Sequence, residues 1–306
     1  MNRPLLYELR DLIARHVSVS GEPLATLPNV VLGFEPAPTP PCVYIAQPVF
    51  SLVAQGIKRV VAGDIALTYG PGQGLTVPID LPMDAYVLNA SEDAPFLGFG
   101  LRLHPPAIAA LLLEQPIARP PAPTAAAKSA GVVVSDVDDI LLDAILRLLR
   151  LLDSPWDLAV LAPAIEREIL WRLLNTPQGN AIRQIGMADS QTTKISRAVK
   201  WLCLHFAEPL RVKALADIAG MSETSFHRHF RLVTAMTPIQ YQKQLRLHAA
   251  RSRLMSATED VAQIAFAVGY DSPSQFSREY RHRYGAPPGK DGRALRAAGT
   301  MPQNSP

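Results

Sequence analysis

Apolar residues in the last third of the chain recur with the period of an α-helix, and they do so in two places. Phe226, Phe230 and Val233 are spaced at i, i+4 and i+7, so they share one face of a helix. Phe276 and Tyr280 stand 50 positions after Phe226 and Phe230 and repeat their spacing. A repeat of this kind predicts two copies of one helical unit.

A short apolar segment that ends in glycine precedes each stripe. Ala216 and Gly220 are four positions apart, as are Ala265 and Gly269. A small residue lets two helices cross closely, and a glycine can take the left-handed conformation that ends a helix. Each copy therefore predicts a helix-turn-helix unit, and two units in one basic segment indicate sequence-specific DNA binding. A pair of ordinary helical hairpins is the alternative, which the matched arginine and phenylalanine in each copy disfavour.

Cap residues mark where the second helices begin. Ser222 is the N-cap candidate in the first unit, and Asp271 or Ser272 can cap in the second, where Pro273 suits the first helical turn. Between the units, the uninterrupted run Ile239–Met255 predicts one connecting helix. A rigid connector would let the two units enter successive major-groove segments, about 34 Å apart on one face of the DNA.

The first part of the chain changes to the pattern of strands. A helix is predicted over residues 4–19, an extended proline-rich stretch over 36–41, and a helix over 105–113. Between residues 42 and 103, short apolar runs alternate with turns, which predicts a small barrel or jelly roll. The predicted strands are Cys42–Ala46, Phe50–Ala54, Lys58–Val61, Asp64–Tyr69, Gly74–Val77, Ala85–Asn89 and Phe96–Leu103.

Two long amphipathic helices are predicted between the barrel and the repeat. Ser135 can cap the first, with Asp138 as its capping-box partner, and the second spans roughly Trp156–Leu174. Periodicity cannot tell a core face from a partner face, so two interpretations of these leucine-rich faces stay open. In one, these helix faces pack on the barrel, and in the other they form a dimer interface.

Charge divides the chain into two unlike halves. The formal net charge is +3 over 306 residues. From residue 190 onward there are 17 basic and 8 acidic residues, a net +9, whereas the first 189 residues have 13 basic and 19 acidic residues, a net −6. This asymmetry coincides with the repeat and indicates a nucleic-acid module joined to another domain.

Length and composition suit a cytoplasmic protein of two domains. No apolar stretch is long enough to span a membrane, and Glu8, Arg10 and Asp11 make the start unlike a signal peptide. The two cysteines, Cys42 and Cys203, are far apart in the sequence, which fits a reducing compartment.

Residues for catalysis are sparse. A metal-dependent barrel enzyme needs clustered histidines and carboxylates, but before residue 190 the histidines are His16 and His104, at opposite ends of the barrel region and not in a His-x-His pair. The sequence has no nucleophile elbow, P-loop or Gly-x-Gly-x-x-Gly motif. We therefore predict no enzyme activity, no cofactor and no bound metal.

Short motifs in both halves resemble one protein family. The C-terminal segment, about residues 190–290, is similar to the DNA-binding domain of AraC/XylS-type regulators, and the first half resembles the N-terminal domain of one branch of them. That resemblance implies an α+β protein, with a cupin-like β-barrel plus helices in front of an all-α domain of seven helices. The motifs in the DNA-binding half are Ala219-Gly220-Met221-Ser222, Phe226–Phe230, Thr237–Tyr241, Val268-Gly269-Tyr270, Ser272–Tyr280 and Tyr284–Pro288. Those in the first half are Gln55–Val60, Asp80-Leu81-Pro82 and Ile165–Leu170.

The resemblance also implies which residues face DNA. The family's base-reading positions fall on Thr224, His227 and Arg228 in the first unit, and on Pro273, Ser274, Ser277 and Arg278 in the second. Pro273 has no donor, so the other six are the predicted base readers; Arg228 and Arg278 lead because an arginine fork matches the acceptor pair of guanine. The predicted phosphate contacts are Ser222, Arg231, Ser272 and Arg281. Many members end in Pro-x-x-Tyr-Arg, whereas here Pro288–Arg293 lacks the aromatic residue.

These observations predict an effector-responsive, sequence-specific transcription regulator. The predicted domains are a sensor over residues 1–117, a linker and helical dimerisation or packing region over 118–189, a DNA-binding domain over 190–291 and a disordered tail over 292–306. The two helix-turn-helix units fall at about 211–232 and 260–283.

The predicted partners are a double-stranded operator, a small-molecule or electrophile effector, a second copy of the chain and, for an activator, RNA polymerase. Cys42 is the candidate effector or redox residue, with a small buried hydrophobe as the alternative role. A cupin-like enzyme fused to a DNA-binding module is the alternative function, and an architectural DNA binder is a third.

Overall fold

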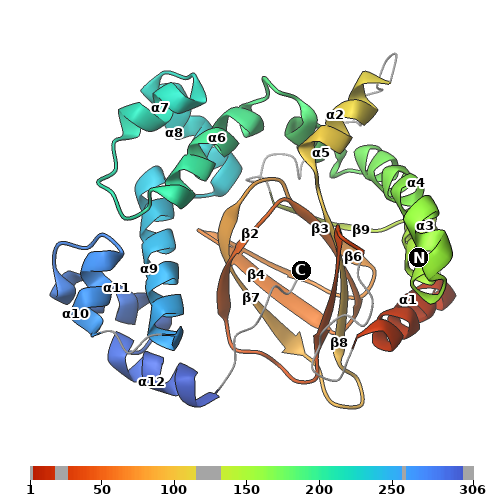
Figure 1. The fold of residues 1–306 in the computed structure, drawn as a ribbon, viewed down its shortest axis with the longest axis horizontal. Helices are drawn as coiled ribbons and strands as arrows, with labels where there is room; N and C mark the ends of the chain where they lie inside the picture. The colour runs from red at the N-terminus through yellow and green to blue at the C-terminus, as the bar shows by residue number, and fades with distance from the viewer. Residues whose placement is uncertain (1–2, 18–26, 115–131, 257–259, 299–306) are drawn as a thin grey trace.

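The computed structural model describes residues 3–17, 27–114, 132–256 and 260–298. Two antiparallel sheets form its centre, with helices α1 to α5 on one side and α6 to α12 on the other (Figure 1). The predicted α+β class is confirmed, and the predicted barrel takes the form of a sandwich of two sheets.

The five-stranded sheet is covered on both faces. Alternate residues of its central strand β3 separate by face, because side chains on a strand point to opposite sides. Phe50 and Leu52 pack with Leu9 and Ile13 of α1, whereas Val53 packs between the sheets. In the order β1-β8-β3-β6-β9, the strands are Val30–Glu35, Phe96–Arg102, Val49–Gln55, Gln73–Val77 and Val133–Asp136.

The four-stranded sheet faces the DNA-binding half. One apolar cluster runs without a break from Met83 of β7 to Ile195 of α6 and Phe230 of α8, so the two halves share a core. In the order β2-β7-β4-β5, the strands are Cys42–Ala46, Leu81–Asn89, Ile57–Ala62 and Ile65–Tyr69.

Helices α1 to α5 bury their leucine-rich faces within the chain. The buried faces include Leu141, Leu148 and Leu149 of α3 and Ile169 and Leu173 of α4, all at most 1% exposed. The interpretation that these faces pack inside the chain is therefore confirmed for those residues. The helices are α1 Arg3–His16, α2 Pro105–Leu113, α3 Asp139–Arg150, α4 Pro155–Leu174 and α5 Gly179–Gly186, with a 3₁₀ turn at Leu151–Asp153.

The structure corrects several boundaries. Helix α3 is capped by Asp138, whose side chain accepts a hydrogen bond from the Leu141 amide at 2.7 Å, while Ser135 lies in strand β9 instead of capping. Strands β1 and β9 and helix α5 were not predicted. At the C-terminal end, α12 continues through residues 292–298, where a disordered tail was predicted.

In the described part of the C-terminal half, seven helices follow one another, as the family resemblance implies. A third apolar cluster, which includes Leu254, Ile264, Phe276 and Tyr280, forms the core of the second unit. The helices are α6 Gln191–Leu204, α7 Val212–Ala219, α8 Glu223–Thr234, α9 Pro238–Ser256, α10 Val261–Ala267, α11 Pro273–Tyr284 and α12 Pro288–Ala298. No described helix is both long enough and apolar enough to cross a membrane.

Candidate DNA-binding surface

The first unit consists of α7, a glycine turn and α8. Gly220 ends α7 in the left-handed conformation, with φ of 64°, and the Met221 amide returns to the Ala216 carbonyl at 2.9 Å. Ser222 then caps α8, its hydroxyl accepting from the Ser225 amide at 3.4 Å. The predicted glycine turn and N-cap are therefore both present.

Buried rings fix the orientation of α8. Phe226 and Phe230 are 0% exposed, with ring centroids 5.3 Å apart, and Phe230 meets Tyr241 of α9 edge-on at 5.6 Å. Because this face is held in the core, the opposite face must point to solvent. That exposed face contains Thr224, His227, Arg228 and Arg231, three predicted base readers and one predicted phosphate contact.

The second unit repeats the arrangement with one difference at its turn. Asp260 and Gln263 form a capping box at the start of α10, and Ser272, not Asp271, caps α11. Gly269 has φ of 90°, and a Cβ placed there would lie 2.2 Å from the Ala207 carbonyl oxygen. This glycine is therefore required both by its conformation and by the close approach of the backbone of the α6–α7 loop.

Helix α11 presents its polar face beside a hollow of the surface. Phe276 and Tyr280 are 0% exposed, and their packing leaves Ser274, Arg278 and Arg281 exposed. Ser277 is half-buried. The hollow is lined by Ser277, Arg278, Arg281, His282, Gly285 and Pro287. His282 also lines this hollow, four residues after Arg278, and was not among the residues predicted from the sequence.

Helix α9 locks the two units together. In Figure 1 it runs between α7–α8 and α10–α11. The Gln242 amide donates to the carbonyls of Phe206 and Glu208 at 3.0 and 2.7 Å, and Arg246 donates to the same two carbonyls at 2.8 and 2.9 Å. Arg246 also lies over the ring of Tyr270, 5.8 Å from its centroid, and burial lowers its pKa. Side chains of the predicted connector therefore reach both the α6–α7 loop and the turn of the second unit.

Helix α12 is held by a carboxylate where many family members have tyrosine. Asp291 accepts hydrogen bonds from the Tyr280 hydroxyl at 2.7 Å and from Arg251 Nε at 3.1 Å. Burial and this bond raise the pKa of Tyr280. The polar tie therefore joins α9, α11 and α12 without the aromatic residue.

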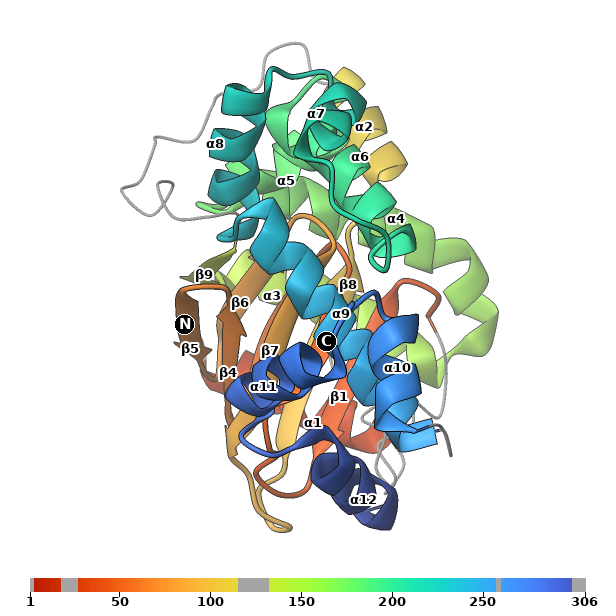
Figure 2. The same cartoon turned by 90° about the vertical axis from the view of Figure 1, so that its left-hand side faces the viewer.

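Residues of the sensor half contact the DNA-binding half at several places. Asp84 of β7 accepts from Arg283 of α11 at 2.5 Å, and the Tyr241 hydroxyl donates to the Asp80 carbonyl at 2.7 Å. Asp64, between β4 and β5, lies 3.9 Å from Arg231. Figure 2 shows α11 in front of the sheet that contains β7 and β4. The sensor therefore contacts both predicted recognition helices.

The two cysteines occupy different settings. Cys203, on α6, lies 3.9 Å from the Tyr241 hydroxyl, and burial raises the pKa of its thiol to about 11, so it is a poor nucleophile at neutral pH. Cys42 begins β2, where its backbone pairs with Ala85; its side chain lies outside the described part of the structure. Within the described residues, no group of three His, Cys, Asp or Glu side chains is arranged to hold a metal.

Two family models match the chain. Residues 26–181 match the N-terminal domain of AraC-type transcriptional regulators, and residues 215–294 match a helix-turn-helix domain.

Curated relatives match over part of their length. The transcriptional activator RhaS of Escherichia fergusonii is 32% identical over 130 residues, 42% of this chain and 46% of RhaS. The transcriptional regulator ArgR of Pseudomonas aeruginosa is 30% identical over 151 residues, 48% of this chain and 45% of ArgR. The chain therefore spans under half the length of these relatives.

A solved structure has the same fold over most of the chain. An apo ToxT variant from Vibrio cholerae covers 88% of this chain and 99% of its own, with a TM-score of 0.53 at 9% identity. A second structure, of wild-type ToxT bound to an unsaturated fatty acid, gives a TM-score of 0.51 at 9% identity and covers 88% of this chain and 96% of its own. At this identity the likeness shows the fold alone.

Proposed function

The chain belongs to the AraC-type transcriptional regulators, and we propose that it controls transcription by binding a specific operator through α8 and α11. One observation carries this proposal. Each of two helix-turn-helix units buries its aromatic face and leaves an arginine, Arg228 or Arg278, exposed on the opposite face. Two such helices on one connector suit two successive major-groove segments.

The exposed side chains divide into base readers and phosphate contacts. The guanidinium groups of Arg228 and Arg278 can donate two hydrogen bonds to guanine O6 and N7. Thr224, His227, Ser274 and Ser277 supply shorter polar groups beside them. Ser222 and Ser272 cap their helices through their oxygen atoms, so their hydroxyl hydrogens remain available for phosphate, with Arg231 and Arg281 alongside. The first unit has more donors, and we expect it to dominate specificity.

The test compares binding to the operator and to scrambled DNA. Genome-wide footprinting first identifies the operator, where each protomer should protect about two adjacent major grooves. Arg228→Ala and Arg278→Ala should each cost about 1–3 kcal/mol and relax specificity at one base pair, with Arg228→Ala the larger. Arg102→Ala, an equal charge change on strand β8, is the control. Equal weakening on every DNA sequence would show that the two arginines contact only phosphate.

The sensor half is proposed to bind a small-molecule or electrophile effector. Its fold is that of ToxT, for which a fatty-acid-bound structure exists, and this supports a small-molecule effector. Cys42 is the proposed electrophile site. If the Cys42→Ala variant is still induced by every electrophile that induces the wild type, Cys42 is not the electrophile site. Induction of the same variant by a non-reactive ligand would still support the effector function.

Effector binding is proposed to act on the contacts between the halves. Asp84, Asp80 and Asp64 reach the two recognition helices or the connector, so a change in the sensor sheets can shift how the two halves are placed. We further propose that the protein works in the cytoplasm as a homodimer, and that an activator form would contact RNA polymerase.

A further inference from the structure

Helix α11 is tied to the connector α9 at two separate points. The Tyr280 hydroxyl donates to Asp291, which also accepts from Arg251 of α9. The second tie is the carboxylate of Glu279, the neighbouring residue of α11, which forms an ion pair with Lys243 of α9 at 3.2 Å. Because Lys243 and Arg251 are eight residues apart, the two ties meet α9 about 12 Å apart along its axis.

The carboxylate of Glu279 is the meeting point of three donors. One oxygen accepts from the Tyr270 hydroxyl at 2.9 Å and lies 3.2 Å from Lys243 Nζ. The other oxygen accepts from Gln275 Nε2 at 3.3 Å. Burial favours the neutral acid, but the three donors outweigh burial and lower the pKa of Glu279. At neutral pH Glu279 is therefore a carboxylate held by the connector, by the turn before α11 and by α11 itself.

Tyr270 links this carboxylate to the α6–α7 loop. Its ring lies under the guanidinium of Arg246 of α9, 5.8 Å from the ring centroid, and Arg246 donates to the carbonyls of Phe206 and Glu208 in that loop. Burial, together with the bond to Glu279, raises the pKa of Tyr270, so its hydroxyl keeps the proton that it donates. A chain of contacts therefore runs from the α6–α7 loop through α9 to the middle of the second recognition helix.

Apolar packing fixes the depth of α11 but leaves its direction to the polar ties. Phe276 and Tyr280 are 0% exposed, and the hydrophobic effect that buries them is non-directional. Hydrogen bonds weaken steeply when their angle changes, so two ties at different points of α9 resist a rotation of α11 across it. With the tie to Asp291 alone, α11 could pivot about that point, and the exposed Arg278 would move with it.

We propose that Glu279 is a positioning residue that sets the separation and angle of the two recognition helices, and thereby the spacing of base-reading subsites that the protein accepts. One inserted base pair moves a subsite by about 3.4 Å and turns it by about 34° around the duplex. A bidentate arginine contact does not follow such a shift unless its helix moves. The inference rests on the proposed operator binding by α8 and α11 and names the residue that fixes their relative placement.

Binding to duplexes of two spacings tests the proposal. The probes are the labelled operator identified by footprinting and the same duplex with one base pair inserted between the two protected grooves. The full wild-type chain should bind the inserted duplex about 30-fold more weakly, as expected for the loss of one bidentate arginine contact. Glu279→Ala should reduce this spacing ratio to less than about fivefold, mainly through weaker binding to the original operator.

Two milder variants separate the contacts of Glu279. Glu279→Gln keeps an acceptor for the Tyr270 hydroxyl and loses the ion pair with Lys243, so its spacing ratio should lie between those of the wild type and Glu279→Ala. Tyr270→Phe removes only the hydroxyl and should also lower the ratio. Partly unfolded protein, or the loss of one negative charge near DNA, changes both affinities alike. The spacing ratio is therefore a readout that a merely structural role of Glu279 would not move.

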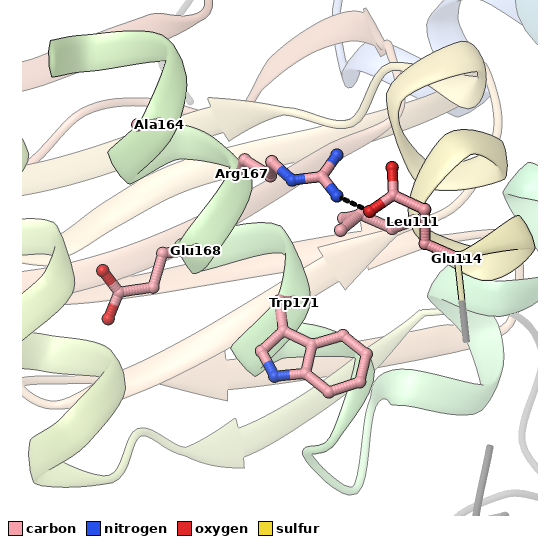
Figure 3. A pocket seen from close by; sticks show the side chains of 6 residues that line it. All are labelled: Leu111, Glu114, Ala164, Arg167, Glu168 and Trp171. Atoms are coloured by element: carbon pink, nitrogen blue, oxygen red, sulfur yellow. Dashed lines mark hydrogen bonds and ion pairs between the residues drawn. The ribbon is translucent and has the colours of Figure 1, made fainter. Parts of the chain in front are cut away.

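The matched control is an ion pair of the same kind on the far side of the sheets. Glu114, directly after α2, pairs with Arg167 of α4 beside a hollow of the surface (Figure 3). Figure 1 places α2 and α4 across the sheets from α9 and α11. Glu114→Gln removes the same charge as Glu279→Gln and should keep the wild-type spacing ratio.

Two results would overturn the proposal while leaving the regulator in place. One is a wild-type spacing ratio in Glu279→Ala, with or without equal weakening on both duplexes, because another contact would then fix α11. The other is a wild-type chain that prefers its operator but binds the inserted duplex equally well, because α11 would then have no fixed position. A wild-type chain that does not distinguish its operator from scrambled DNA would instead refute the proposed function itself.

Discussion

Replacing Asp84 with asparagine tests whether one ion pair holds the second recognition helix against the sensor. The Asp84 side chain, on β7, is 9% exposed, and its carboxylate accepts from Arg283 of α11, which is 25% exposed. The substitution keeps the size of the side chain and removes its charge. Arg283 would retain its place over the Tyr284 ring, 5.5 Å from the centroid.

The free energy lost on breaking the Asp84–Arg283 ion pair depends on how far the pair is buried. Breaking a fully buried ion pair costs about 3–5 kcal/mol, whereas an exposed pair contributes about 0–1 kcal/mol. Water can reach Arg283 on one side, so we expect an intermediate loss of about 2 kcal/mol, or about 30-fold in the equilibrium between the packed and released positions of α11. If DNA binding requires the released position, operator affinity should rise by up to that factor.

Fluorescence anisotropy with a labelled operator duplex measures the effect. The matched control is Asp64→Asn, because Asp64 is 78% exposed and lies 3.9 Å from Arg231, so its loss should change affinity little. Arg283→Ala is a poor substitute, since Arg283 can contact DNA itself. An unchanged or weakened operator affinity for Asp84→Asn would refute the reasoning and show that α11 binds DNA without leaving β7.

Three further predictions concern stability. His248 has its pKa lowered from 6.5 by burial and by nearby Arg251, so the unfolded chain takes up this proton at a higher pH than the folded chain. The free energy of unfolding, measured with urea, should therefore fall as pH drops below about 6.5. His248→Gln should make this free energy less dependent on pH. The same pH dependence in wild type and variant would show that His248 is not its source. Gly269→Ala should cost about 3 kcal/mol, because the new Cβ meets the Ala207 backbone, whereas Gly220→Ala, with open space around it, should cost about 1 kcal/mol. Equal melting temperatures of the two alanine variants would contradict this. Asp291→Ala should lower the free energy of unfolding by about 2 kcal/mol, and Asp291→Asn by less because the amide keeps an acceptor for Tyr280; equal losses would show that the hydrogen bond is not the cause.

Local features of the chain were the ones that sequence could predict. The left-handed Gly220 and Gly269, the caps Ser222 and Ser272 and the aromatic stripes are each defined within a few residues, because helix ends and helix faces depend on neighbours in the chain. Exposure of the predicted arginines then follows from burial of the rings on the other face.

Strands at sheet edges were harder to predict. Strand β9 is only four residues long and exists because Gln73–Thr76 of β6 pairs with it, more than fifty residues earlier in the chain. Its last residues, Ser135 and Asp136, also resemble the start of a helix, so local cap chemistry predicted the wrong structure. Ser135 pairs with Gly74 of β6, and Asp138, three residues later, caps α3 instead.

Ion pairs between the halves use part of the positive charge that the sequence count assigns to the DNA-binding half. The net −6 and +9 of the two halves predicted a DNA-binding module, but part of that positive charge is already paired inside the chain. Asp84 pairs with Arg283, and Asp64 lies near Arg231, a predicted phosphate contact. Phosphate and the sensor's carboxylates would therefore compete for arginines on the same two helices. Release of Asp84 would accompany a phosphate contact by Arg283, so part of the electrostatic gain on DNA would be offset, and an effector that moves β7 would change that offset directly.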